Sequence, residues 1–184
     1  DATHQGFAYE GAGMALALLD RLTPWKRSRL ESFLQGPGEP HTYMVIIGAG
    51  WAWARLGSPI HRLAAKLDPL LGWLAFDGYG FHEGYFHPQR SVEQQIRPKS
   101  MSGYAGRVFD AGLGRSLWFV CGAQPNALAK TIEAFSKDRQ VDLWAGAGLA
   151  CAYAGGVEIS CYDEMRRLAG DHYGFLAQGV AFAA

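Results

Sequence analysis

The chain has 184 residues, 49% of them hydrophobic, and is therefore long and apolar enough to bury a sizeable core. Its 17 lysines and arginines are balanced by 17 aspartates and glutamates, so no net positive charge favours a nucleic-acid partner. The three cysteines form no CxxC pair, and their odd number argues against a complete disulfide framework. We therefore interpret them as buried thiols.

Apolar residues at helical spacing recur along the whole chain and predict helices, usually an apolar helix followed by a more polar one. Strands have little support, because valine and isoleucine are sparse. In chain order, the predicted pairs are residues 7–22 with 24–34, 41–56 with 58–67, 104–121 with 125–135, and 141–153 with 161–168, while 70–86 and 173–184 have no second helix. Thr23 with Pro24 and Ser58 with Pro59 are signals for the start of a helix. Residues 87–102, which include two prolines, are predicted to form the longest irregular loop.

A glycine pair, or its near equivalent, lies inside each apolar segment. The first glycines of these pairs are separated by 37, 30, 34, 34 and 33 residues, and they are Gly11, Gly48, Gly78, Gly112, Gly146 and Gly179. A period of about 34 residues is typical of two-helix repeats that stack into a solenoid. The sequence therefore predicts an all-α fold, an α-solenoid of antiparallel helix pairs that is similar in period to tetratricopeptide repeats but lacks their consensus. We expect one helical-repeat domain over residues 1–184.

Glycine inside a helix costs about 1 kcal/mol relative to alanine, so its repeated use predicts that neighbouring backbones approach closely at these positions. A small residue follows four positions after the first glycine in five of the six units, namely Ala15, Ala52, Ser116, Ala150 and Ala183. The third unit places His82 there, with Glu83 beside it. This break in a regular face makes the pair the main candidate site.

His82 and Glu83 are candidates for acid/base catalysis or for ligand binding, with a purely structural pair as the alternative. Tyr79 and neighbouring aromatic residues would line an apolar pocket around them. A zinc-binding helix needs two histidines four residues apart, but His82 and His87 are five apart, or about 140° around a helix. No metal site and no cofactor is therefore predicted.

Other polar or aromatic residues in the apolar segments are weaker candidates for binding. Glu10 and Asp77 stand just before the glycine pairs of their units, and Trp51 lies in a narrow aromatic stripe. Arg115 would bind an anion or form an ion pair with Asp77 or Asp110. Neither a dinucleotide-binding or phosphate-binding glycine loop nor a nucleophile elbow occurs in the sequence.

The longest apolar run and the two ends of the chain indicate whether the chain spans a membrane and what adjoins it. Residues 43–54, about 12 residues, are too few to span a bilayer, which takes about 20. The sequence begins at Asp1 and ends in an apolar segment, from which we expect a piece of a longer protein. We also expect further sequence, an oligomer or another chain to cover the two ends of the repeat.

Five blocks of the sequence resemble a bacterial family of unknown function that is often encoded beside enediyne polyketide synthase genes. They are THQGFAYEG (3–11), DGYGFHEG (77–84), GLGRSLWFV (112–120), DLWAG (142–146) and AYAGG (152–156). The resemblance implies a role in specialised metabolism in the bacterial cytoplasm, but it brings no known activity. The leading hypothesis is a non-catalytic binding or scaffold protein that holds a partner protein or an apolar intermediate. The alternative is a cofactor-independent tailoring enzyme that uses His82 and Glu83 as an acid/base pair.

Overall fold

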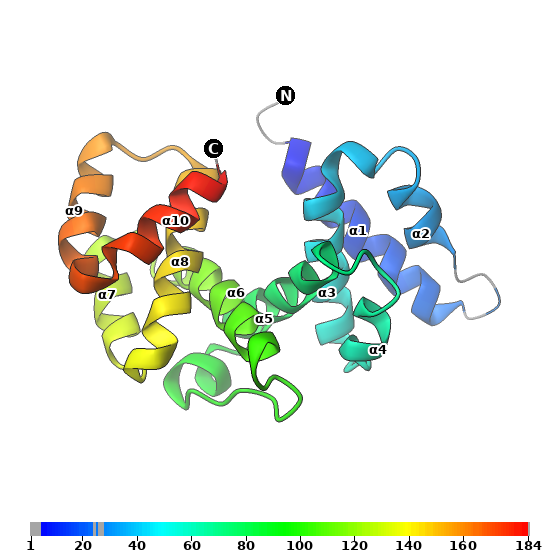
Figure 1. Cartoon of the computed structure of the whole chain (residues 1–184), viewed down its shortest axis with the longest axis horizontal. Coiled ribbons are helices and arrows are strands. Elements are labelled where there is room, and N and C mark those ends of the chain that lie inside the picture. Colours follow the sequence, from blue (N-terminus) through cyan, green and yellow to red (C-terminus); the bar gives the residue numbers. More distant parts are fainter. Residues whose placement is uncertain (1–4, 24, 26–27, 184) are drawn as a thin grey trace. The chain divides into compact units, whose positions relative to one another are not determined.

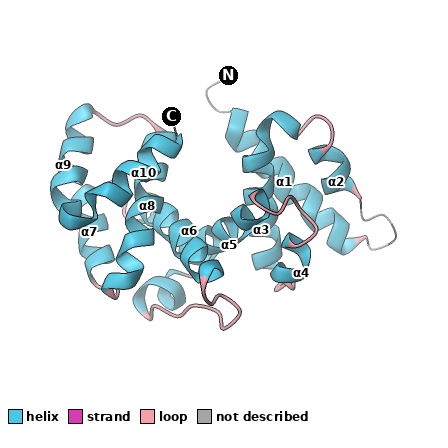
Figure 2. Cartoon of the chain, viewed as in Figure 1, coloured by secondary structure: helices cyan, strands magenta, loops and turns pink. Residues whose placement is uncertain are grey.

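The structure is a computed structural model that describes residues 5–23, 25 and 28–183. Within these residues it contains ten α-helices and no strand. Figures 1 and 2 show how these helices follow one another along the chain. The prediction of an all-α protein is confirmed. None of the described helices combines the length and the apolar character that crossing a membrane requires.

By its contacts the chain divides into two compact units, Asp1–Tyr79 and Gly80–Ala184, with the boundary inside α5 (Leu74–Phe86). The other helices of the first unit are α1 (Gln5–Leu22), α2 (Arg29–Leu34), α3 (Thr42–Arg55) and α4 (Ile60–Ala64). Here α1 packs along α3, while the short helices α2 and α4 pack on α1 and α3 respectively.

The second unit contains the end of α5 and five further helices. They are α6 (Tyr104–Val120), α7 (Pro125–Glu133), α8 (Lys137–Ala154), α9 (Ile159–Ala169) and α10 (Tyr173–Ala183). Helix α8 packs between α6 and α10, and α7 packs on α9 as a second layer. Bulky side chains with almost no exposed surface form the core of this unit, among them Phe109, Leu113, Trp118, Leu128, Ile132 and Trp144.

Most of the paired glycines lie at helix contacts, as predicted, whereas Gly11 has open space around it. At most of them a Cβ atom would overlap a backbone carbonyl oxygen of a neighbouring helix. In the first unit the overlaps are Gly13 with Val45, Gly48 with Glu10, Gly50 with Ala75, and Gly78 with Ile47. In the second they are Gly80 with Phe109, Gly114 with Leu143, Gly146 with Ala111, Gly148 with Leu176, and Gly179 with Ala145.

These contacts keep one register in both units. The second glycine of a pair meets the carbonyl of the residue three positions before the next pair, as Gly13 meets Val45 and Gly148 meets Leu176. The first glycine of a pair meets the carbonyl just before the preceding pair, as Gly48 meets Glu10. Side chains larger than hydrogen would force such helices apart, which explains why the sequence accepts the cost of helical glycine.

The second helices of the first unit differ from the prediction. Helix α2 begins at Arg29 rather than at residue 24, and Pro24 lies outside the described residues. Helix α1 ends at Leu22, and the backbone N–H and the hydroxyl of Thr23 both bond to the Leu19 carbonyl oxygen. Asp20 accepts the backbone N–H groups of Arg29 (3.2 Å) and Leu30 (3.0 Å), and so caps α2 from a distance. Helix α4 is also shorter than the predicted 58–67.

The predicted loop 87–102 contains one π-helical turn, Gln89–Glu93, and is held to the second unit by defined bonds. The Gln95 side-chain amide donates to the Ala134 carbonyl oxygen (2.7 Å), and the Gln95 carbonyl oxygen accepts from Arg139 (2.9 Å). Arg97 of the same loop bonds to Asp110 (3.0 Å). These bonds place the loop against α6 and α8.

Candidate functional site

The site residues proposed from the sequence are distributed over the two units. Glu10, Trp51, Asp77 and Tyr79 lie in the first unit, on α1, α3 and α5. His82, Glu83 and Arg115 lie in the second unit, on α5 and α6. The residues that the structure brings together with a measured contact are His82 and Glu83.

His82 and Glu83 form a buried pair near the end of α5. Their exposed fractions are 2% and 6%, and His82 Nδ1 lies 3.2 Å from Glu83 Oε1. Gly80 and Gly84 hold this part of α5 against α6, because a Cβ on either would overlap Phe109 or Ser116. The imidazole and the carboxylate are therefore removed from bulk water by the close approach of two helices.

His87 joins the pair, contrary to the separation expected from helical geometry. The two imidazole centroids are 5.6 Å apart, and one potential ligand atom from each of His82, Glu83 and His87 lies within 4.8 Å of the others. The angle of about 140° holds for a regular helix, whereas α5 ends at Phe86 and a π-helical turn follows; the His87 N–H still bonds to the Glu83 carbonyl oxygen (3.0 Å). His87 is exposed, whereas the other two residues are buried.

Arg115 is buried on α6, with its guanidinium carbon 4.9 Å from the centroid of the Phe81 ring. Asp110, one of the two acids considered as its partner, forms ion pairs with Arg97 (3.0 Å) and Arg139 (2.6 Å). A pairing of Arg115 with Asp77 stays a prediction.

Asp110 is the centre of a second buried polar cluster. Burial raises the pKa of its carboxyl group, an effect that the hydrogen bond and charge of Arg139 and the charge of Arg97 oppose. Arg139 lies 4.8 Å from the Phe135 ring centroid and also bonds to the Gln95 carbonyl oxygen. Both oxygens of the carboxylate have an arginine partner. We therefore interpret this cluster as structural, because it connects α6 to α8 and to the loop.

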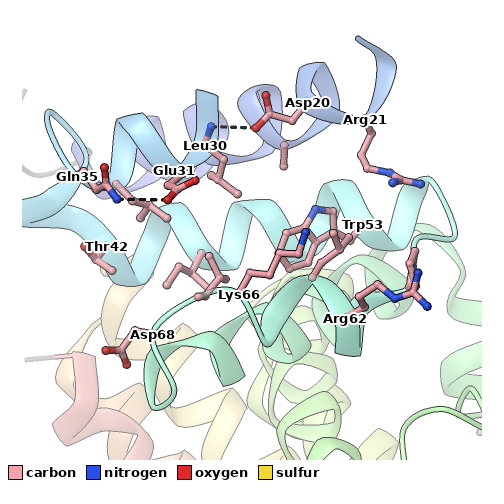
Figure 3. A pocket seen from close by; sticks show the side chains of 16 residues that line it. Asp20, Arg21, Leu30, Glu31, Gln35, Thr42, Trp53, Arg62, Lys66 and Asp68 are labelled. Carbon is pink, nitrogen blue, oxygen red and sulfur yellow. Dashed lines mark hydrogen bonds between the residues drawn. The ribbon is translucent and has the colours of Figure 1, made fainter. Parts of the chain in front are cut away.

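The first unit contains a pocket of about 780 Å³ that the sequence analysis did not predict. Its walls come from α1, α2, α3, α4 and the turn after α4 (Figure 3). The apolar lining residues are Ala17, Leu30, Leu34, Ile46, Trp53, Pro59, Leu63 and Leu67. Three cationic side chains, Arg21, Arg62 and Lys66, and three acidic ones, Asp20, Glu31 and Asp68, complete the lining together with Gln35 and Thr42.

The acids and bases of this pocket differ in how they are bonded. Asp20 caps α2, Glu31 accepts from Gln35 (3.4 Å), and Asp68 accepts the backbone N–H groups of Leu70 and Leu71 (both 2.8 Å). The side chains of the three cations form no ion pair or hydrogen bond with another residue that the structure describes. In Figure 3, Arg21 and Arg62 extend at the same end of the pocket, and Lys66 extends near Trp53. The pocket therefore offers positive charge beside an apolar floor.

Part of this pocket has a signal in the sequence. Arg62 and Lys66 are four residues apart, a spacing that would place them on one face of the helix predicted over residues 58–67, although α4 ends at Ala64. Arg21, from the last turn of α1, comes from a distant part of the chain and has no such signal. The short α2 and α4, which leave the space open, were predicted as longer helices.

The second unit has a smaller cavity of about 310 Å³ between α8, α9 and α10. Cys151, Met165, Tyr173 and Leu176 are among its lining residues. Burial raises the pKa of the Cys151 thiol to about 12, so this thiol is protonated at neutral pH. The cavity offers no activated nucleophile in Cys151.

Comparison with known proteins identifies the family and adds no activity. A family model described as "Protein of unknown function (DUF1702)" matches residues 1–184. Searches of curated proteins and of solved structures found no match.

Proposed function

Because the chain belongs to the DUF1702 family of proteins of unknown function, we propose its role from its own geometry: it is a non-catalytic helical protein that binds an apolar molecule with an anionic end. The resemblance stated from the sequence adds the setting, which is bacterial specialised metabolism of the enediyne type in the cytoplasm. The ligand would be a polyene or aromatic intermediate that carries a carboxylate or a phosphate group.

The observation that carries this proposal is the pocket of the first unit. Its volume of about 780 Å³ lies in the range of small-molecule sites. The floor, which includes Trp53 and Ile46, would contact an apolar chain, while Arg21, Arg62 and Lys66 would bind its anionic end. Of the acids nearby, Asp20 accepts the backbone N–H of Leu30 and Asp68 that of Leu70.

The architecture we propose around the pocket is an α-solenoid of antiparallel helix pairs. It is supported by the glycine contacts, because equivalent glycines of successive helices meet equivalent carbonyl groups within each unit. In repeat proteins of this kind, insertions and shortened helices often shape the binding surface. Here the short helices α2 and α4 leave the pocket open.

The proposal is tested with cis-parinaric acid, a fluorescent polyene carboxylate, titrated into the full chain. We expect saturable binding, and a loss of about tenfold in affinity in Arg62→Gln and in Lys66→Gln, since each would lose a charge-assisted contact. Arg55→Gln, on an exposed residue of α3 outside the pocket, is the matched control. The methyl ester of the probe, which has no charge, should bind all the proteins equally weakly.

Two outcomes would refute this function: no saturable binding to the folded protein, or equal affinity in the pocket variants and the control. A tailoring enzyme that uses His82 and Glu83 is the alternative, supported by their buried contact of 3.2 Å. A His82→Ala variant that binds the probe normally but cannot convert a substrate intermediate would favour that alternative. A scaffold for another protein would instead give a stable complex in native mass spectra from the producing organism.

A further inference from the structure

We propose that His82, Glu83 and His87 bind a divalent transition-metal ion of the zinc class. This site is separate from the pocket of the first unit and independent of the proposed function. Its basis is the position of two imidazoles and a carboxylate at the end of α5, with the potential ligand atoms within 4.8 Å of one another.

The donor set suits such an ion. Zinc binds imidazole nitrogen and carboxylate oxygen at about 2.0–2.2 Å, and two histidines with one glutamate form a known type of three-ligand site that leaves the fourth position open. Ligand atoms around a tetrahedral ion of this size are about 3.4 Å apart. The distance between His82 Nδ1 and Glu83 Oε1, 3.2 Å, is close to this value. The His87 side chain is exposed, and its potential ligand atom lies within 4.8 Å of the other two.

The charge around Glu83 gives the second argument. Its carboxylate is 8% exposed, and its recorded hydrogen bond is to His82. Its ion-pair partner among the described residues is His82, which is charged only when protonated, whereas Asp110, 1% exposed, has two arginines. Burial of a carboxylate is costly unless a cation accompanies it. A divalent ion shared with two imidazoles would supply that charge.

The end of α5 provides the geometry. His87 comes directly after the helix, and its carbonyl oxygen accepts the N–H groups of Arg90 (3.1 Å) and Ser91 (3.0 Å) in the following turn. This turn is π-helical, a conformation often found at functional sites. The helix therefore supplies two buried ligands, and the turn fixes the backbone of a third, exposed one.

The test uses the full chain, freed of metal with a chelator and titrated with Co²⁺, whose visible absorption reports four-coordinate binding. We expect one ion per chain, competition by Zn²⁺, and a rise in melting temperature on binding. His87→Gln should weaken Co²⁺ binding by more than the roughly 10- to 100-fold that follows loss of an outer-shell partner. Because His87 is exposed, this variant should fold like the wild type, which circular dichroism will verify.

The matched control is His61→Gln, on an exposed histidine of α4 in the other unit, which should bind Co²⁺ like the wild type. Glu83→Gln gives a second check. It keeps the size of the side chain but removes its charge, so it should also weaken Co²⁺ binding. Absence of Co²⁺ and Zn²⁺ binding by the folded wild type would overturn the proposal. Equal affinity in wild type and His87→Gln would overturn it as well, because binding would then lie elsewhere.

Discussion

The two units use the same glycine contacts between their apolar helices but have different second layers. In the second unit α7 and α9 have 9 and 11 residues and pack on each other, and the cavity between α8, α9 and α10 is only about 310 Å³. In the first unit α2 and α4 have only 6 and 5 residues and border a pocket of about 780 Å³. The apolar helices thus provide the common framework, and the length of the second helices determines how much space remains for a ligand.

The polar side chains that connect helices also differ between the two units, in how deeply they are buried and in what they bind. Asp110 is 1% exposed and bonds to two arginines, which join the loop and α8 to α6. Asp20 is partly exposed and connects α1 to the start of α2 through two backbone N–H groups and Arg29. The second unit therefore depends on a buried charge, and the first on a helix cap.

The largest expected effect is a difference in stability between variants that remove Asp110 and Asp20. Asp110→Ala should lower the free energy of unfolding by about 3–5 kcal/mol, because it leaves arginine charges without their buried partner. Asp20→Ala should cost about 1 kcal/mol, the usual value for a lost helix cap. Urea denaturation of both variants measures the difference. Equal losses would show that the two connections are equivalent.

The second prediction concerns the second layers themselves. Leu128 of α7 is fully buried, and Leu128→Ala should cost about 2–5 kcal/mol through lost packing and a new cavity. Leu63 of α4 is partly exposed at the edge of the pocket, so Leu63→Ala should cost less than about half as much. Thermal unfolding of both variants checks this. If Leu63→Ala is the more destabilising change, α4 is a core element and the contrast between the layers is wrong.

The third prediction tests the framework that the units share. Gly13→Ala and Gly148→Ala should each destabilise the protein by about 1–3 kcal/mol, since the new Cβ meets a backbone carbonyl that cannot move freely. Gly11 and Gly174 lie on the same or an adjacent helix with open space around them. Their alanine variants should gain up to about 1 kcal/mol from helix propensity. A loss confined to one unit would mean that the contacts are not equivalent.

Much of the helical framework was predictable, because its signals are local. Segments such as α6 and α10 agree with the sequence to within a residue at each end. Helical spacing and the cost of glycine together predicted that the paired glycines lie at helix contacts, and the overlaps at Gly114 and Gly146 confirm it. The start of α2 was wrong because Asp20, nine residues before Arg29, supplies the cap.

The candidate sites were less predictable. His82 was singled out because it interrupts the small face, and its contact with Glu83 is between adjacent residues. The approach of His87 did not follow, because it depends on where α5 ends. The partners of Asp110 lie 13 and 29 residues away, and nothing in the local pattern relates them.

What the sequence by itself determined is therefore the all-helical content, the repeated close contacts and the break at His82. All three depend on residues within a few helical turns of one another. The tertiary structure alone decided the pocket beside Trp53, the arginine partners of Asp110 and the meeting of His87 with His82. The pocket and the partners of Asp110 depend on which distant segments pack together, and the meeting of His87 with His82 depends on the local conformation at the end of α5. Helical periodicity carries no information on either.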